Sequence, residues 1–186
     1  MSPAVPLSLR APASSLVAHP STPLAAVRQV RVLTRRDPAG VLELHYRLEG
    51  DLPHITIPAP GDGGAADELW RHTCFEAFLA APGASAYREL NFSPSLAWAS
   101  YHFGGYRERL AAVPQEPPPQ LAVRRERDVL ALNAVVPLGA LAASAPLHVA
   151  LAAVVEDFRG GLSYWALRHP PGKPDFHHPH GFVLEI

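Results

Sequence analysis

The sequence predicts an all-β fold, an antiparallel β-sandwich, and two observations lead to this prediction. Proline makes up 21 of the 186 residues, more than double its usual share of about 5%, and it falls in clusters along the chain. Because proline interrupts helices and central strands alike, these clusters mark loops. The apolar runs between them have the length of strands, and short elements joined by stiff loops are typical of an all-β sandwich.

Length and composition fit one globular domain. A hydrophobic content of 48% excludes a disordered chain, and the formal net charge of -1 comes without the Lys and Arg clusters of a nucleic-acid-binding protein. No stretch approaches the roughly 18 apolar residues of a membrane span, and the first residues lack the pattern of a signal peptide. With a single cysteine, Cys74, these features predict a cytoplasmic protein that binds neither nucleic acid nor membrane.

The first part of the chain predicts a hairpin. Residues 1–22 are rich in proline and serine, and we expect them to supply at most one edge strand, near residues 5–10. The domain itself is expected to span residues 23–186. Residues 27–36 and 41–49 are two apolar runs separated by a Pro- and Gly-containing turn, and the second run alternates strictly between apolar and polar residues. Both features favour paired antiparallel strands.

The rest of the chain continues the pattern of short strands. Residues 121–126 and 129–136 predict a second hairpin, and residues 147–155 form an apolar run that suits a strand buried on both faces. Short helical turns are expected over residues 106–112 and 137–141. Further strands are expected over residues 54–57, 87–93, 96–103, 162–167 and 182–186.

The stretch most informative about function is residues 69–79, Leu-Trp-Arg-His-Thr-Cys-Phe-Glu-Ala-Phe-Leu. In a strand, Cys74, Glu76 and Phe78 share one face, so a carboxylate lies between two apolar side chains. Burying a charge without a partner is costly. Glu76 is therefore either paired or directed into a cleft that binds something polar, and Trp70, at the entrance of the strand, would form a wall of that cleft.

Polar side chains also follow one face of the next predicted strand. Tyr87, Glu89 and Asn91 alternate along residues 87–93, and the loop before them is short enough for a hairpin that would place them beside Glu76. A hydroxyl-rich ligand needs such a mixture of donors and acceptors next to an aromatic surface. The alternative is a hydrogen-bonded polar network in the core or on an exposed face.

The three tryptophans, Trp70, Trp98 and Trp165, are either core side chains or platforms on which a flat ligand face stacks. Trp70 and Trp165 lie beside loop sequences, which favours the stacking role for these two. Trp98 lies in the middle of a predicted strand.

Histidines gather in the C-terminal loop, where His169, His177, His178 and His180 accompany Asp175. Such a cluster can bind zinc or another transition metal. Adjacent histidines in an extended chain point to opposite sides, however, and no second ligand cluster has the usual spacing. We therefore expect a surface or structural loop and no metal.

Common enzyme motifs are missing from the sequence: it has no Gly-x-Ser-x-Gly, no phosphate-binding Gly-rich loop before a helix and no His-Glu-x-x-His. Two enzymatic alternatives stay open. Glu76 and Glu89 would make an acid/base pair of the glycosidase kind. Cys74 is either a small buried residue or a nucleophile with His72, two residues earlier on the same face, as its base.

Several motifs together resemble the bacterial DOMON-like proteins, which are related to the family 9 carbohydrate-binding modules. They are the stretch 69–79, the sequence Tyr-Arg-Glu-Leu-Asn-Phe-Ser-Pro over 87–94, and the segments 163–167 and 169–178. The resemblance covers residues 20–186. It implies a β-sandwich of jelly-roll type, with one or two short helices and a ligand pocket on one face.

The resemblance also implies the nature of the site. In the family 9 modules a sugar lies between two tryptophans and is held by acidic and amide side chains. Trp70 and Glu76 resemble the Trp-then-Glu spacing of that site, Trp165 would be the second tryptophan, and Tyr87 and Asn91 match less closely. Other DOMON relatives bind haem through a Met and a His, but the only methionine here is the first residue, so we expect no cofactor.

The prediction is a non-catalytic domain that binds a small ligand, a sugar or a sugar-like molecule. Its alternative is a hydrolytic or sugar-modifying enzyme that uses Glu76 and Glu89 in the same pocket, assisted by His177 or His178. The predicted ligand-binding residues are Trp70, Glu76, Tyr87, Glu89, Asn91 and Trp165.

Overall fold

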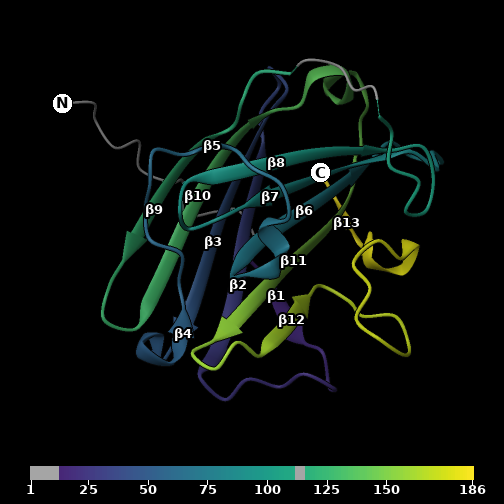
Figure 1. Cartoon of the computed structure of the whole chain (residues 1–186). Helices are drawn as coiled ribbons and strands as arrows, with labels where there is room; N and C mark the ends of the chain where they lie inside the picture. The colour runs from purple at the N-terminus through teal and green to yellow at the C-terminus, as the bar shows by residue number, and fades with distance from the viewer. Residues whose placement is uncertain (1–12, 112–115) are drawn as a thin grey trace.

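The computed structural model describes residues 13–111 and 116–186, and its regular elements are almost all strands (Figure 1). In chain order the strands are β1 (Ala13–Ala18), β2 (Val27–Arg36), β3 (Val41–Gly50), β4 (Ile55–Thr56), β5 (Gly64–Ala65), β6 (Cys74–Ala80), β7 (Tyr87–Phe92), β8 (Ala97–Phe103), β9 (Gln120–Arg125), β10 (Val129–Pro137), β11 (His148–Asp157), β12 (Leu162–Ala166) and β13 (Leu184–Glu185). The short 3-10 helices are η1 (Leu52–His54), η2 (Leu69–Arg71), η3 (Gly139–Ala143) and η4 (Pro179–Gly181). The all-β prediction is confirmed.

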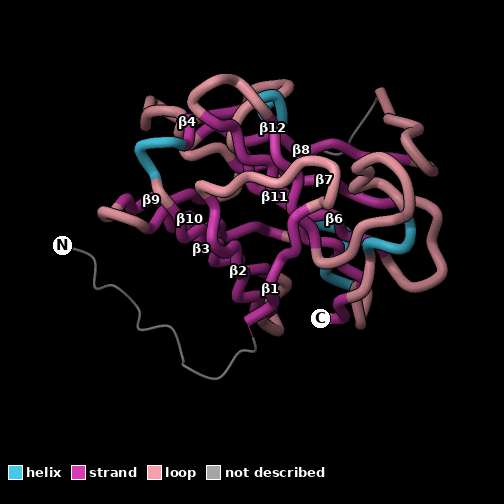
Figure 2. The backbone as a smooth tube through the Cα atoms, turned by 90° about the horizontal axis from the view of Figure 1, so that it is seen from below, coloured by secondary structure: helices cyan, strands magenta, loops and turns pink. Residues whose placement is uncertain are grey.

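The strands form one continuous path of hydrogen-bonded neighbours, in the order β5-β8-β7-β6-β11-β12-β1-β2-β3-β10-β9, with β4 and β13 attached to β11. Strand β1 connects the two halves, because its first residues pair with β2 and its last two pair with β12. The sheet is strongly curled, and Figure 2 shows its two halves from below. The finer prediction, a jelly-roll sandwich, stays a prediction.

The core fills the space between the two halves of the curled sheet. Tyr46 of β3 and Phe75 of β6 meet there, with ring centroids 5.0 Å apart. The buried Tyr46 hydroxyl donates a hydrogen bond of 2.8 Å to the backbone oxygen of Glu76. This contact therefore fixes the position of β6 from the core side.

Strand β6 separates the core from the opposite face of the sheet. Phe75, Ala77 and Leu79 belong to the main core cluster, whereas Phe78 belongs to a second cluster on the other face. Because side chains alternate along a strand, Glu76 shares that other face. All seven residues of β6 are nevertheless buried, so both faces of the strand are covered.

Both predicted hairpins are present, as β2 with β3 and β9 with β10. The apolar residues that alternate along residues 41–49 are buried, as expected. Gly50, at the end of β3, is required sterically: a Cβ atom there would lie 2.2 Å from the backbone oxygen of Ala26. Trp98 packs against the core cluster, which supports its interpretation as a core side chain.

Three local predictions need correction or fall outside the structure. Residues 69–71 form the 3-10 helix η2 and β6 begins only at Cys74, so the strand is shorter than the apolar run. The described part of residues 106–112 contains no helix, and Arg109 forms an isolated bridge with Phe103 instead. The edge strand expected near residues 5–10 lies outside the described residues, while β1, within the Pro- and Ser-rich segment, was not predicted.

The described residues include no helix that is long and apolar enough to cross a membrane.

The Tyr46 contact gives a prediction for stability. Tyr46→Phe removes the hydroxyl from the core but keeps the ring, and the loss of one buried hydrogen bond should lower the free energy of unfolding by about 0.5–1.5 kcal/mol. Urea unfolding should show a lower midpoint with an unchanged slope. Tyr164→Phe, which deletes the same atom from a partly exposed ring on the other face of the sheet, is the matched control. Equal midpoints for both variants would show that the Tyr46 hydroxyl does not hold β6.

Candidate functional site

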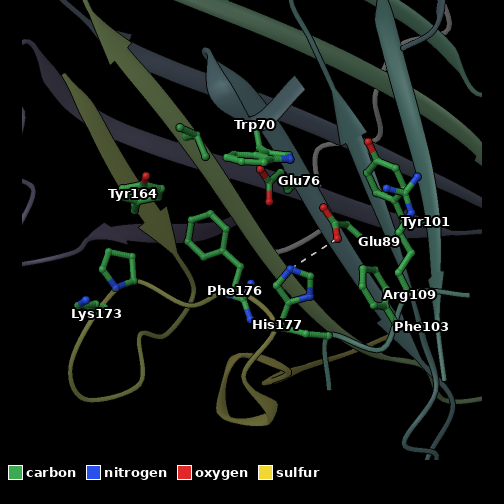
Figure 3. Close-up of a pocket in the computed structure, with 13 residues that line it drawn as sticks. Trp70, Glu76, Glu89, Tyr101, Phe103, Arg109, Tyr164, Lys173, Phe176 and His177 are labelled. Atoms are coloured by element: carbon green, nitrogen blue, oxygen red, sulfur yellow. Dashed lines mark ion pairs between the residues drawn. The ribbon is translucent and has the colours of Figure 1, made fainter. Parts of the chain in front are cut away.

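A cavity of about 510 Å³ opens on the face of the sheet that is opposite to the core (Figure 3). The register of the strands assembles its floor: β6 pairs with β7 so that Glu76 lies opposite Asn91, and β7 pairs with β8 so that Glu89 lies opposite Tyr101. Side chains that point to the same face from neighbouring strands therefore lie side by side on the floor of the cavity. The lining residues are Trp70, Glu76, Glu89, Tyr101, Phe103, Arg107, Arg109, Val154, Tyr164, Lys173, Pro174, Phe176 and His177.

Trp70 forms a wall of the cavity from the turn that precedes β6. Leu69 packs against the apolar cluster on this face of the sheet, so the next residue along the tight η2 turn points elsewhere. The Trp70 side chain is 43% exposed, and in Figure 3 its indole lies directly above Glu76. The guanidinium of Arg71 lies 5.4 Å from the centre of the indole ring. Trp70 is thus held over the floor with much of its surface open to a ligand.

Glu76 is the buried acid at the floor. Its side chain is only 2% exposed, yet its Oε1 atom has no hydrogen-bond partner among the described residues. Burial raises the pKa of this carboxyl well above its ordinary value, and the nearby Glu89 raises it further. A buried polar atom without a partner is costly. Oε1 is itself closed to solvent, although Glu76 is one of the residues that line the cavity.

Glu89 is the second acid of the floor, and its surroundings differ from those of Glu76. Asn91 donates a hydrogen bond of 2.6 Å from Nδ2 to Glu89 Oε1, which orients the carboxylate. Burial raises the pKa of Glu89, and the Asn91 hydrogen bond and the charge of Arg107 oppose this shift. One acid of the pair is therefore supported by neighbours and the other is not.

A chain of hydrogen bonds positions His177 beside Glu89. The backbone N–H of Arg107 donates to the Tyr87 hydroxyl at 3.1 Å, and this hydroxyl lies 2.8 Å from Nδ1 of His177. Burial, with the charge of Arg107, lowers the pKa of His177 to about 4, so the ring is neutral near pH 7. If the hydroxyl donates to Nδ1, the neutral ring carries its hydrogen on Nε2, which lies 3.7 Å from Glu89 Oε2.

The cationic side chains lie at the rim, and two of them have partners there. Arg107 forms an ion pair of 2.8 Å with Asp175. Arg109 lies over the ring of Tyr101, 4.1 Å from its centre, and 3.8 Å from Asp67. In Figure 3, Arg109 and Lys173 lie on opposite sides of the two glutamates. The rim cations thus flank the floor acids, and the two arginines are already paired with other groups.

The structure brings some of the predicted ligand-binding residues together and separates others. Trp70, Glu76 and Glu89 line the same cavity. Asn91 and Tyr87 do not line it, but each contacts a residue that does: Asn91 orients Glu89, and Tyr87 contacts His177.

Trp165 has to be removed from the predicted site. It lies opposite Ala153 of β11, on the core face of the sheet, and it is 7% exposed within the main core cluster. The preceding residue, Tyr164, has the other parity and lines the cavity. The expected sugar site between two tryptophans therefore has one tryptophan, and a tyrosine takes the neighbouring position.

Two further interpretations are decided by the geometry. Cys74 is fully buried, and burial raises the pKa of its thiol well above the ordinary value. His72 points to solvent instead, with Nδ1 2.8 Å from a carboxylate oxygen of Glu156, so the proposed Cys–His pair is not formed. The histidine loop contributes His177 to the cavity, and the described residues contain no group of three or more potential metal ligands.

Sequence reasoning missed most of the aromatic lining. Tyr101 and Phe103 alternate along β8 on the face that also carries Glu89, so their parity could have identified them once the β7–β8 pairing was assumed. Phe176 and Lys173 come from the C-terminal loop, where no strand periodicity relates them to the sheet. His177 was named as a possible metal ligand of the loop and, with His178, as a helper of the two glutamates in the enzymatic alternative, but not as a ligand-binding residue.

No protein-family model matches the sequence, and no curated protein matches it. Solved structures that are similar in fold include the following two. One is a proposed carbohydrate-binding protein from Bacteroides uniformis, with a TM-score of 0.66 and 16% identity over 92% of this chain and 84% of that one. The other is a family 9 carbohydrate-binding module from Caldicellulosiruptor kristjanssonii in complex with cellotriose, with a TM-score of 0.55 and 11% identity over 92% of this chain and 83% of that one. At these identities the similarity establishes the fold alone.

The environment of His177 predicts an unusual titration. Because burial disfavours the charged ring, its NMR signals, assigned with the His177→Gln variant, should change with a midpoint near pH 4 rather than near the ordinary value of about 6.5. The unfolded chain takes up this proton first, so the free energy of unfolding of the wild type should fall, relative to that of His177→Gln, as the pH drops from about 6.5 to 4. A midpoint near 6.5 would show that the ring is accessible to water.

Proposed function

We propose that this chain is a non-catalytic carbohydrate-binding domain, with residues 23–186 together with β1 as the binding domain and a sandwich related to that of the family 9 modules. One observation carries the proposal: the buried carboxylate of Glu76, with an unpartnered oxygen, lies beneath the exposed indole of Trp70 in one open cavity. Sugars present apolar C–H faces and polar hydroxyl edges. The cavity offers a surface for each.

The energetics of the floor favour a hydroxylated ligand. Leaving a buried acceptor unsatisfied costs about 1–3 kcal/mol, and a small shift of the Glu76 carboxyl that let a ligand hydroxyl donate to its buried Oε1 would remove this cost. Stacking on Trp70 would add the burial of apolar surface. The cavity volume of about 510 Å³ falls within the usual range of small-molecule sites, about 300–1,000 Å³.

The structural neighbours support this proposal by analogy. Both are described as carbohydrate-binding, and the module from Caldicellulosiruptor kristjanssonii holds cellotriose. Cellotriose is therefore a rational first probe. The site proposed here differs from the expected two-tryptophan arrangement, because Tyr164 and Phe176 accompany Trp70 in the lining.

The alternative function is glycoside hydrolysis, in which two carboxyl groups flank the scissile bond. Glu76 and Glu89, the pair of acids in the cavity, extend from adjacent strands on the same sheet face. An assay for reducing-sugar release with each bound saccharide tests the enzymatic alternative directly.

Replacing the indole tests the stacking surface. A saccharide present at one hundred times its dissociation constant should raise the free energy of unfolding by about 2.7 kcal/mol, and thermal shift against a panel that includes cellotriose should reveal it. Trp70→Ala should abolish most of the shift, because the variant loses the platform but no core contact. Trp165→Phe is the matched control, which should lower the melting temperature of the free protein and preserve the ligand-induced shift.

The opposite pattern would contradict the proposed site. A ligand response that survives Trp70→Ala but disappears in Trp165→Phe would locate binding elsewhere. A complete lack of response to neutral and charged saccharides would reject carbohydrate binding.

A further inference from the structure

The two arginines that line the cavity interact with carboxylates at the rim, whereas the two acids on its floor do not form ion pairs with these arginines. The guanidinium of Arg107 is paired with Asp175 and that of Arg109 lies near Asp67, so both interact with carboxylates at the rim. His177 is neutral near pH 7 because its pKa is about 4. Neither floor acid forms an ion pair with an arginine or a lysine among the described residues, although the charges of Arg107 and Arg109 favour the ionised form of Glu89. Lys173, which also lines the cavity, is likewise in no ion pair among those residues.

Glu76 is the less compensated of the two. Its Oε1 has no hydrogen-bond partner among the described residues, and the side chain is nearly completely buried. The electrostatic influence of the nearby Glu89 adds to the effect of burial, and both raise the pKa of Glu76. Two carboxyl groups that share a site disfavour each other's ionisation. A cation from outside the protein would stabilise the charges of both.

Aromatic rings surround the same acids. Trp70 lies above Glu76 in Figure 3, and Phe176 borders it on the side away from Glu89. Tyr101, Phe103 and Tyr164 complete the aromatic lining. The faces of such rings attract cations, and aromatic cages with nearby acids are a common way to bind ammonium groups. This cavity has the same combination of groups, with two acids on its floor and aromatic rings around them.

We propose that the ligand of this cavity carries a protonated amine, so that within the proposed carbohydrate-binding function the preferred class is the amino sugars. The ammonium group lies between the Trp70 indole and the carboxylates of Glu76 and Glu89, and the sugar hydroxyls face the rim. This inference rests on the proposed function for the sugar part of the ligand. The ammonium part rests on the acids and the rings alone.

The test compares amino sugars with their neutral parents. Glucosamine, galactosamine and mannosamine are each titrated against the corresponding glucose, galactose and mannose by calorimetry at pH 7, where primary amines are mostly protonated. Phosphate buffer is used, because amine buffers would themselves compete for the cavity. We expect at least one amino sugar to bind about tenfold more tightly than its parent, a difference of about 1.4 kcal/mol.

Variants of the two floor acids test whether the preference for amino sugars depends on their charges. Glu76→Gln keeps the shape of the side chain and removes its charge, so it should reduce the ratio of amino-sugar affinity to parent-sugar affinity to about twofold or less. Glu89→Gln should act in the same direction. Glu126→Gln is the matched control: Glu126 is exposed, pairs with Arg124 in another part of the sheet, and should leave the preference unchanged.

The possible results separate this inference from the proposed function. Neutral and amino sugars that bind equally, in a manner dependent on Trp70, would overturn the inference and support carbohydrate binding. A preference that persists in Glu76→Gln and Glu89→Gln would also overturn it. Binding of tetramethylammonium without any saccharide would support the cation site and reject the sugar. No binding of any of these probes would reject both.

Discussion

The position of Glu76 is the constraint on which the rest of the site depends. Its backbone oxygen accepts the hydrogen bond of Tyr46 inside the core, while its side chain lies on the opposite face of the sheet, at the floor of the cavity. One residue of β6 is therefore held by the core on one side of the sheet and lines the cavity on the other. Because the sheet curls around the core, the contact with Tyr46 aligns β6 and with it the strands that carry Glu89 and the aromatic lining.

The same location explains the electrostatics of the cavity. A strand buried on both faces offers little water to a carboxylate, and neither Tyr46 nor the apolar neighbours of Glu76 supply a charge. Nearby, His177 is held next to the Tyr87 hydroxyl and stays neutral near pH 7, so it does not neutralise Glu89 as a cation would. One carboxyl oxygen of Glu76 is thus left without a hydrogen-bond partner among the described residues, at a cost that the stability of the surrounding sheet must offset.

The sequence predicted which residues share a strand face better than it predicted which strands and loops meet at the cavity. Strict alternation over residues 41–49, and the shared parity of Glu76 and Phe78, follow from side-chain periodicity alone, and the structure agrees with both. The segment that contains Tyr164 and Trp165 shows where this reasoning ends. Periodicity states that adjacent residues face opposite ways but not which of them faces the core, and the larger indole was assigned to the wrong face. The loop residues Phe176 and His177 depend on a fold of the C-terminal segment that has no periodicity from which to predict it.

The exchange of a second tryptophan for Tyr164 and Phe176 changes how the cavity can select a ligand. Two parallel indoles would select mainly by stacking, which any flat sugar ring satisfies on both faces. With one indole and smaller rings, less of the contact energy would come from stacking. The polar groups of the floor would then contribute more to the choice of ligand. In the proposed site, the carboxyl of Glu76 and the Asn91-oriented carboxylate of Glu89 would distinguish ligands by charge and by hydrogen-bond donors. A buried polar site discriminates most strongly against a ligand that lacks the matching group, because the protein groups are then left unpaired.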